Sequence, residues 1–184
     1  DIVITSRNRP LQNVPTMVYG NKPVAGGNFF MTDAEKNEFL NKEPRAEKYV
    51  RRIFGSQEFI NSENRWCLWL KDASPGEIRT MPEIMRRVEA VRKFRMQSKK
   101  AATVRQAEIP SLFAEIRQTG SDYLLVPLVS SEHRKYIPLG FFTGEVIVNN
   151  LASIVPDATL YHFGVLPSAM HMTWMRQVCG RLES

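Results

Sequence analysis

Four basic residues spaced seven apart are the strongest candidates for chemistry in this chain, and that chemistry is contact with a polyanion. They are Arg79, Arg86, Lys93 and Lys100. Seven residues of an α-helix rise about 10.5 Å and return to nearly the same face, so the four charges would form a stripe about 30 Å long. Such a stripe could follow several phosphates of a duplex, and each neutralised phosphate would steepen the salt dependence of binding. The spacing therefore predicts phosphate contacts along one long basic helix.

The excess positive charge of the chain lies in the same segment. The chain has 184 residues and a net charge of +6. Residues 79–105 contain nine basic and two acidic side chains, a net charge of +7, so the rest of the chain sums to −1. A solvated helix face usually interleaves the two signs, and this segment does not. The imbalance favours a nucleic acid or another polyanion as the partner.

The opposite face of the same helix is expected to be buried. Apolar residues recur there at three- and four-residue spacing, at Met81, Ile84, Met85, Val88 and Val91. Beyond Val91 the apolar pattern stops, because Arg92, Arg95 and Lys99 stand where core residues would be. We therefore expect the helix to project beyond its own domain at this end, or to meet a partner there.

The sequence lacks the motifs of enzymes that act on DNA or nucleotides. It has no Gly-x-Gly-x-x-Gly or Gly-x-x-x-x-Gly-Lys loop for phosphates. It also has no Asn-Pro-Pro-Tyr segment of an amino methyltransferase and no Pro-Asp followed by Glu-x-Lys of a metal-dependent nuclease. Three His and two Cys, with no close Cys-x-x-Cys or His-x-x-x-His pair, do not make a zinc site. We predict no catalytic residue and no metal site in this chain.

Cys67 and Cys179 lie far apart in the sequence. Without a secretion signal, we expect both to be reduced, buried thiols. A free-standing enzyme could use Cys179 as nucleophile with His162 or His171 as base. Cys179 lies in an apolar helix pattern, however, and this pattern favours a small core residue over a nucleophile.

The composition is that of an ordinary globular domain. Hydrophobic residues make up 43% and charged residues 24% of the chain. No apolar run approaches the roughly 20 residues of a membrane-spanning helix, and the N-terminus lacks the features of a signal peptide. We therefore expect a cytoplasmic protein with no membrane partner. Because the sequence begins with Asp1 and not with Met, we expect it to be part of a longer polypeptide.

Local signals predict four helices. Thr32 and Glu35 have the spacing of a capping box, hydroxyl first and carboxylate three residues later. Pro44 fits the first turn of a helix, and Gly55 fits its C-terminal stop. The expected helices cover residues 32–41, 45–54, a long basic helix from 75 onward, and 168–182.

Short apolar segments between turn residues predict the strands. They cover residues 16–19, 28–31, 65–71, 123–129, 136–142, 146–154 and 158–165. Strands among separated helices favour an α+β fold, with a mixed β-sheet, flanking helices and one long basic helix, over an alternating βαβ fold. Residues 1–184 are expected to form one domain, with or without a small N-terminal lobe over residues 1–60.

Several segments, in order along nearly the whole chain, carry the pattern of a known family. They are Phe59-Ile60-Asn61, Arg65-Trp66-Cys67-Leu68-Trp69-Leu70, Arg87-Val88-Glu89-Ala90-Val91-Arg92, Ser130 to Pro138, Ala158 to Leu166, Met170 to Arg176, and Cys179-Gly180-Arg181-Leu182. Each segment alone is a weak signal, and the ordered set is specific. The chain resembles the target recognition domain of MmeI-like (Type IIG/IIL) enzymes, which combine restriction with DNA adenine-N6 methylation in one polypeptide.

The resemblance implies that this chain recognises a sequence in double-stranded DNA for a fused adenine-N6 methyltransferase and restriction endonuclease. The methyltransferase domain, with its S-adenosylmethionine site, would precede residue 1 and would be this domain's partner in the same polypeptide. The implied setting is a bacterial restriction-modification system. No cofactor is expected within the fragment itself.

The resemblance also places base-recognising side chains late in the domain. By position they are Asn149, Asn150 and Leu151, followed by Glu183 near the C-terminus. Asn can bond adenine N6 and N7 together, and Glu can accept from cytosine N4. The alternatives are an ordinary turn at Asn149-Asn150 and a solvated helix end at Glu183.

A polar loop over residues 130–135 is a further candidate. Arg134, between His133 and Lys135, could reach a phosphate or a guanine edge. An ordinary polar hairpin is the alternative.

A non-specific basic module for RNA or single-stranded nucleic acid is the competing hypothesis. Such modules stack bases on exposed aromatic side chains. Trp66, Trp69 and Trp174 lie in apolar strand or helix patterns, so we expect all three to be buried. Buried tryptophans favour duplex recognition over stacking.

Overall fold

Two four-stranded sheets form the centre of the molecule. The structure, a computed structural model, describes residues 12–179. The first sheet pairs antiparallel except between β3 and β7, and its order is β2 (Phe30–Met31), β4 (Trp66–Leu68), β3 (Val50–Phe54), β7 (Ile147–Val148). The second sheet pairs antiparallel, and its order is β1 (Val18–Tyr19), β8 (Ala152–Pro156), β5 (Tyr123–Pro127), β6 (Gly140–Phe142).

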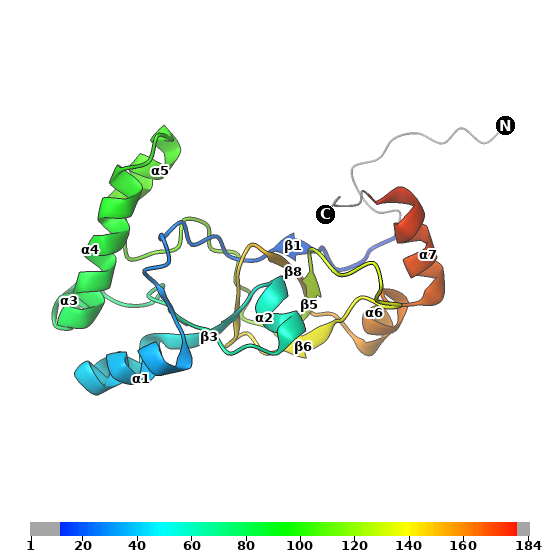
Figure 1. Cartoon of the computed structure of the whole chain (residues 1–184), viewed down its shortest axis with the longest axis horizontal. Coiled ribbons are helices and arrows are strands. Elements are labelled where there is room, and N and C mark those ends of the chain that lie inside the picture. Colours follow the sequence, from blue (N-terminus) through cyan, green and yellow to red (C-terminus); the bar gives the residue numbers. More distant parts are fainter. Residues whose placement is uncertain (1–11, 180–184) are drawn as a thin grey trace.

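Helices lie at both ends of this pair of sheets. Helices α3, α4 and α5 stand at one end of an elongated molecule, and α7 lies at the other (Figure 1). The helices are α1 (Asp33–Lys42), α2 (Ser56–Asn61), α3 (Pro75–Arg79), α4 (Pro82–Met96), α5 (Ala101–Arg105), α6 (Leu160–Val165) and α7 (Ala169–Val178), with 3-10 helices η1 (Pro44–Tyr49) and η2 (Gln106–Glu108). The α+β prediction is confirmed, although there are two sheets and not one. Within residues 12–179, no helix is both long enough and apolar enough to cross a membrane.

The start of α1 follows the predicted capping box. The Thr32 hydroxyl accepts from the Glu35 N–H at 3.3 Å, and the Glu35 carboxylate accepts from the Thr32 N–H at 2.8 Å. Two N–H groups that the first helical turn leaves unpaired are thereby satisfied. The helix ends at Lys42, one residue beyond the expected end.

Residues 50–54 form a strand, so the helix predicted over 45–54 is wrong. The structure has η1 followed by β3. Strand β3 pairs with β4 on one side and β7 on the other, and it buries Ile53 and Phe54. Pairing on both sides is a tertiary gain that overrides the local helix signal of Pro44.

Two predicted strands in the C-terminal part of the chain also differ from the structure. Residues 160–165 form helix α6, not a strand, and Thr159 caps it by donating its N–H to His162 Nδ1 at 3.0 Å. The strand expected over 146–154 is divided into β7 and β8 by a turn at residues 149–151. This turn takes the chain from the first sheet to the second.

The first core lies between the first sheet and helices α1, α3 and α4. The predicted apolar face of the basic helix is confirmed, since Met81, Ile84, Val88 and Val91 are buried and Met85 is partly buried. Strands β3 and β4, on either side of residue 60, are paired neighbours in this sheet. A lobe ending at residue 60 would therefore divide the sheet.

The second core is built around aromatic rings that pack against the second sheet. Phe54, Phe59 and Phe142 pack mutually, with ring centroids 5.2–6.5 Å apart. Gly140 permits this packing, because a Cβ there would lie 2.9 Å from the Phe59 ring. Phe54 is the last residue of β3, so its ring ties the end of the first sheet to the second core.

The burial of the tryptophans differs from expectation. Trp66 and Trp69 are partly buried against the first core, and the Trp69 ring lies 5.1 Å from that of Phe113. Trp174 is 65% exposed, so its predicted burial is wrong. In α7 the buried side chain is Met172, Met175 is partly buried, and Met170, Trp174 and Val178 are exposed.

The two cysteines also differ from each other. Cys67 is buried in the first core, and burial raises the pKa of its thiol far above the ordinary value. Cys179 is exposed at the end of α7, so its predicted burial is wrong. Both are free thiols, as expected.

Candidate nucleic-acid interface

The basic segment is not one continuous helix, and the predicted stripe is wrong in this respect. Arg79 ends α3, α4 begins at Pro82, and Lys100 is the N-cap of α5. Proline at the first position of a helix has no N–H to offer a preceding turn, so it favours a new start. Arg86 and Lys93 are the two members of the predicted stripe that share α4.

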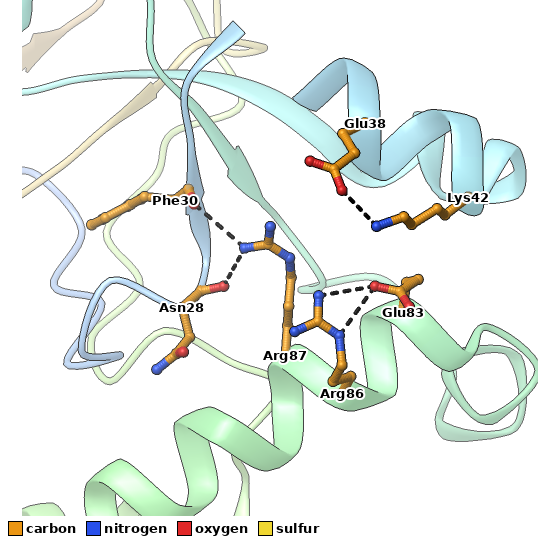
Figure 2. A network of polar contacts seen from close by, with 7 residues as sticks. All are labelled: Asn28, Phe30, Glu38, Lys42, Glu83, Arg86 and Arg87. Atoms are coloured by element: carbon orange, nitrogen blue, oxygen red, sulfur yellow. Dashed lines mark hydrogen bonds and ion pairs between the residues drawn. The ribbon is translucent and has the colours of Figure 1, made fainter. Parts of the chain in front are cut away.

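Two adjacent arginines on α4 already have partners within the fold (Figure 2). Arg86 donates from Nε and Nη2 to one oxygen of Glu83, at 3.1 and 2.9 Å. Arg87 donates from Nη1 to the carbonyl oxygens of Asn28 at 2.8 Å and Phe30 at 3.4 Å. Partial burial lowers the pKa of Arg87. Arg87 therefore fastens α4 to β2, and Arg86 presents a charge that Glu83 largely balances.

Arg95 is fully buried, so at this residue the prediction that α4 projects from its domain or meets a partner is wrong. Its guanidinium donates to five backbone carbonyls at 2.6–3.1 Å, those of Pro23, Val24, Gln106, Ile109 and Leu112. Burial lowers its pKa. The five donors of the guanidinium thus replace apolar packing and hold two distant segments against α4.

Four exposed cations remain where α4 gives way to α5. They are Lys93, Lys99, Lys100 and Arg105, and we refer to them as the α4–α5 tip. Within residues 12–179, none of the four is in an ion pair. The neighbouring Arg92 pairs only at 3.9 Å with Glu89. The exposed charge of the basic segment is therefore concentrated at its C-terminal end.

Asn149 is used within the fold. It is 8% exposed; its N–H donates to the Phe54 carbonyl at 2.8 Å, and its Oδ1 accepts from the Leu151 N–H at 2.8 Å. A Cβ at Gly20 would lie 2.2 Å from its carbonyl oxygen, and one at Gly55 would lie 2.8 Å from its side chain. Asn149 therefore stabilises the turn, which agrees with the alternative of an ordinary turn at this position. The sequence pattern favoured a helix stop at Gly55 and gave no sign of its packing against the Asn149 side chain.

Asn150 and Leu151 form the outer part of the same turn. Asn150 is partly exposed, and Leu151 is 59% exposed. The antiparallel register pairs Pro127 with Ala152, so this turn and the loop that follows β5 lie at the same end of the second sheet. That loop contains Arg134. Two of the candidate recognition segments are thus brought to one edge.

The loop with Arg134 packs against α7. Arg176 donates from Nη2 to the carbonyls of Arg134 at 3.2 Å and Lys135 at 3.1 Å. Between the loop and α7 is an open cavity of about 320 Å³, lined also by His133 and Cys179. The Arg134 side chain is exposed. Glu183, the remaining candidate, lies outside the described residues.

Residues 12–179 contain no group of three or more His, Cys, Asp or Glu that could hold a metal ion. The candidate interface has two parts: the α4–α5 tip at one end of the molecule, and the turn at 149–151 with the loop that contains Arg134, beside the second sheet (Figure 1). Exposed cations can neutralise phosphates, and polar side chains on loops can bond base edges.

Comparison with known proteins identifies the family. Residues 1–184 match the family model of the MmeI target recognition domain. The chain belongs to this family. Its structure superposes on that of the Type IIL restriction-modification enzyme MmeI, solved in complex with DNA, with a TM-score of 0.94 and 47% sequence identity, covering 100% of this chain and 25% of that one.

The chain is also similar to DNA methyltransferase A of Bacillus subtilis (strain 168). It is 37% identical over 184 residues, which are 100% of this chain and 21% of the relative. The chain thus spans between a fifth and a quarter of the proteins it matches. In both relatives, the segment that matches this chain is one part of a much longer polypeptide.

Proposed function

We propose that this chain recognises a specific sequence of double-stranded DNA for a larger enzyme that combines DNA methylation with restriction. The observation that carries the proposal is the family match over the whole chain. The near-identical fold of MmeI, solved with DNA bound, supports it. A target recognition domain contributes sequence choice, and the chemistry is performed elsewhere in the polypeptide.

In this proposal the loops beside the second sheet contact the bases. Asn150 would bond an adenine edge, Leu151 would meet a thymine methyl group, and Arg134 would bond guanine. Glu183 would accept from cytosine N4. The partial exposure of Asn150 and the exposure of Leu151 and Arg134 support their assignment. We do not include Asn149, because its side chain is enclosed in the turn.

Phosphate contacts are assigned chiefly to the α4–α5 tip. Lys93 and Lys100 were expected from the sequence, and Lys99 and Arg105 lie beside them. Arg79 is exposed on α3 and could add a contact at the other end of α4. Arg86 would have to exchange Glu83 for a phosphate, so we expect its contribution to be smaller.

The catalytic work is proposed for other parts of the polypeptide. We propose that the parent enzyme methylates adenine N6 with S-adenosylmethionine, that its methyltransferase domain is this domain's partner, and that it acts in the cytoplasm, where the DNA is. The absence of methyltransferase and nuclease motifs from the sequence supports a non-catalytic role for this chain. The similarity to DNA methyltransferase A supports the methyltransferase assignment.

A randomised duplex library tests the proposal. The full-length parent enzyme, as wild type, Asn150→Ala and Asn150→Asp, would methylate or cleave the library, and sequencing would give the recognition sequence of each. We expect both variants to change preference at one base pair by about 1–3 kcal/mol while binding to random duplex is retained. Asn41→Ala, at an exposed position near the end of α1, is the control. Identical recognition sequences for wild type and both Asn150 variants would remove Asn150 from the interface.

The competing hypothesis of a non-specific basic module makes a different forecast. Such a module would bind specific and random duplexes equally at every salt concentration, and it would favour single strands. The exposure of Trp174, and of other aromatic side chains such as Tyr161 and Phe94, is in its favour. A wild-type preference that survives added salt excludes it, because phosphate contacts alone weaken equally on all sequences.

A further inference from the structure

The hydroxyl of Ser56 lies between the two loops that carry candidate base contacts. Its Oγ donates to the carbonyl oxygen of Leu151 and accepts from the N–H of Leu128 at 2.9 Å. The residue is 5% exposed. Leu151 belongs to the turn between β7 and β8, and Leu128 is the first residue after β5. One side chain therefore bonds both segments through their backbones.

The side chains next to these backbone groups point to solvent. Leu128 is 45% exposed and Leu151 is 59% exposed. Asn150 precedes Leu151, and Arg134 lies farther along the loop that begins at Leu128. Because Pro127 pairs with Ala152 across β5 and β8, the two segments start from adjacent points of the second sheet. Ser56 bonds each segment where it leaves the sheet.

The helix that carries Ser56 is itself held firmly. Phe59 of α2 packs between Phe54 and Phe142, and the Gly55 N–H donates to the Glu58 carboxylate at 2.9 Å. The Phe54 carbonyl accepts from the Asn149 N–H at 2.8 Å. The hydroxyl is thus a fixed point from which the positions of both loops are set.

We infer that Ser56 is a positioning residue for DNA sequence recognition: it fixes the turn at 149–151 relative to the loop with Arg134. The inference rests on the proposed function. Bonds to base edges are directional and need their donors held within about 0.5 Å, whereas phosphate contacts tolerate movement. Loss of the hydroxyl would leave the Leu151 carbonyl and the Leu128 N–H unpaired and would let the two loops move separately. Discrimination between sequences should fall, and affinity for random DNA should not.

The test compares three variants of the full-length parent enzyme. Ser56→Ala removes both bonds, Ser56→Thr keeps the hydroxyl, and Ser74→Ala is the matched control. Ser74 also uses its hydroxyl to bond a backbone N–H, that of Glu77 at 3.2 Å, but it does so at the start of α3, away from the loops. Each enzyme would be assayed for its recognition sequence in a randomised duplex library and for its affinity ratio between the preferred and a random duplex.

We expect Ser56→Ala to lower the affinity ratio by about 5- to 10-fold, part of the range that one base contact supplies. Random-duplex affinity should stay unchanged, and Ser56→Thr and Ser74→Ala should keep the wild-type ratio. Because both affinities are measured on the same preparation, an unfolded fraction lowers both equally and leaves their ratio unchanged. A wild-type ratio in Ser56→Ala overturns the inference, as does an equal loss in Ser74→Ala. A wild-type enzyme without sequence preference would instead overturn the proposed function.

Discussion

Five carbonyl oxygens surround the Arg95 guanidinium at the end of the first core. They come from residues 23–24 and 106–112, so one side chain joins α4 to two segments far apart in the sequence. Apolar periodicity cannot forecast such a role, because it counts arginine as a break in the buried face. The same limit applies to Ser56 and Asn149, which bond backbone groups 72 to 95 residues away in the sequence.

Replacing Arg95 should therefore be costly. Arg95→Ala leaves the five carbonyls without their donor, and we expect a loss of about 3–5 kcal/mol in the free energy of unfolding. Arg92→Ala, on the exposed side of the same helix, should stay within about 0.5 kcal/mol of wild type. Urea denaturation of both variants measures the difference. Equal, small losses would show that the Arg95 bonds contribute little.

The two thiols should differ in reactivity. Cys179 is exposed, whereas burial raises the pKa of Cys67 and keeps it protonated. Only the thiolate attacks an alkylating reagent. A maleimide should label the native protein at Cys179 and reach Cys67 only after denaturation, as peptide mass spectrometry would show. Rapid labelling of native Cys179→Ser would contradict the assigned burial of Cys67.

At the scale of elements, the sequence predicted correctly those features that depend on residues close together in the chain. The capping box of α1 and the apolar face of α4 depend on residues three or four apart, and both were predictable. The strand at 50–54 and the helix at 160–165 were not. The first is stabilised by pairing with β4 and β7, and the second relies on His162 as a capping partner, which the usual Glu or Gln signature does not cover.

The turn at 149–151 should not tolerate a side chain at Gly20. A Cβ there would lie 2.2 Å from the Asn149 carbonyl, so backbone must move. We expect Gly20→Ala to lower the free energy of unfolding by about 1–3 kcal/mol, as overpacking does. Gly76→Ala is the control, because nothing lies within 4 Å of its Cβ and alanine favours a helix. Thermal unfolding distinguishes the two, and equal melting temperatures would contradict the packing.

The α4–α5 tip should govern salt dependence. Lys99→Ala with Lys100→Ala should weaken binding of the parent enzyme to all duplexes alike and reduce the slope of log affinity against log salt by about one unit per lost phosphate contact. Arg86→Ala should change the slope less, because Glu83 already pairs with that charge. Affinity measured at several salt concentrations gives both slopes. An unchanged slope in the double variant would make the tip a solvated surface.

At the scale of the whole molecule, the proposed functions lie on different parts of an elongated fold. The α4–α5 tip is at one end, and the loops assigned to base recognition lie beside the second sheet (Figure 1). This separation allows sequence choice to change in the loops without loss of general DNA affinity. The concentration of positive charge in residues 79–105 could be found from the sequence alone, whereas the arrangement of the loops could not. Charge is a property of composition, whereas a recognition loop depends on which distant segments hold it.

An exchange of this domain between enzymes tests the central claim most directly. Residues 1–184 would replace the matching 184 residues of DNA methyltransferase A, to which they are 37% identical. The methylated sites of the hybrid would be compared with those of both parent enzymes by sequencing. If this chain determines sequence choice, the hybrid methylates the sequence of this chain's parent enzyme and not that of DNA methyltransferase A. A hybrid that methylates the original Bacillus sequence would contradict the account.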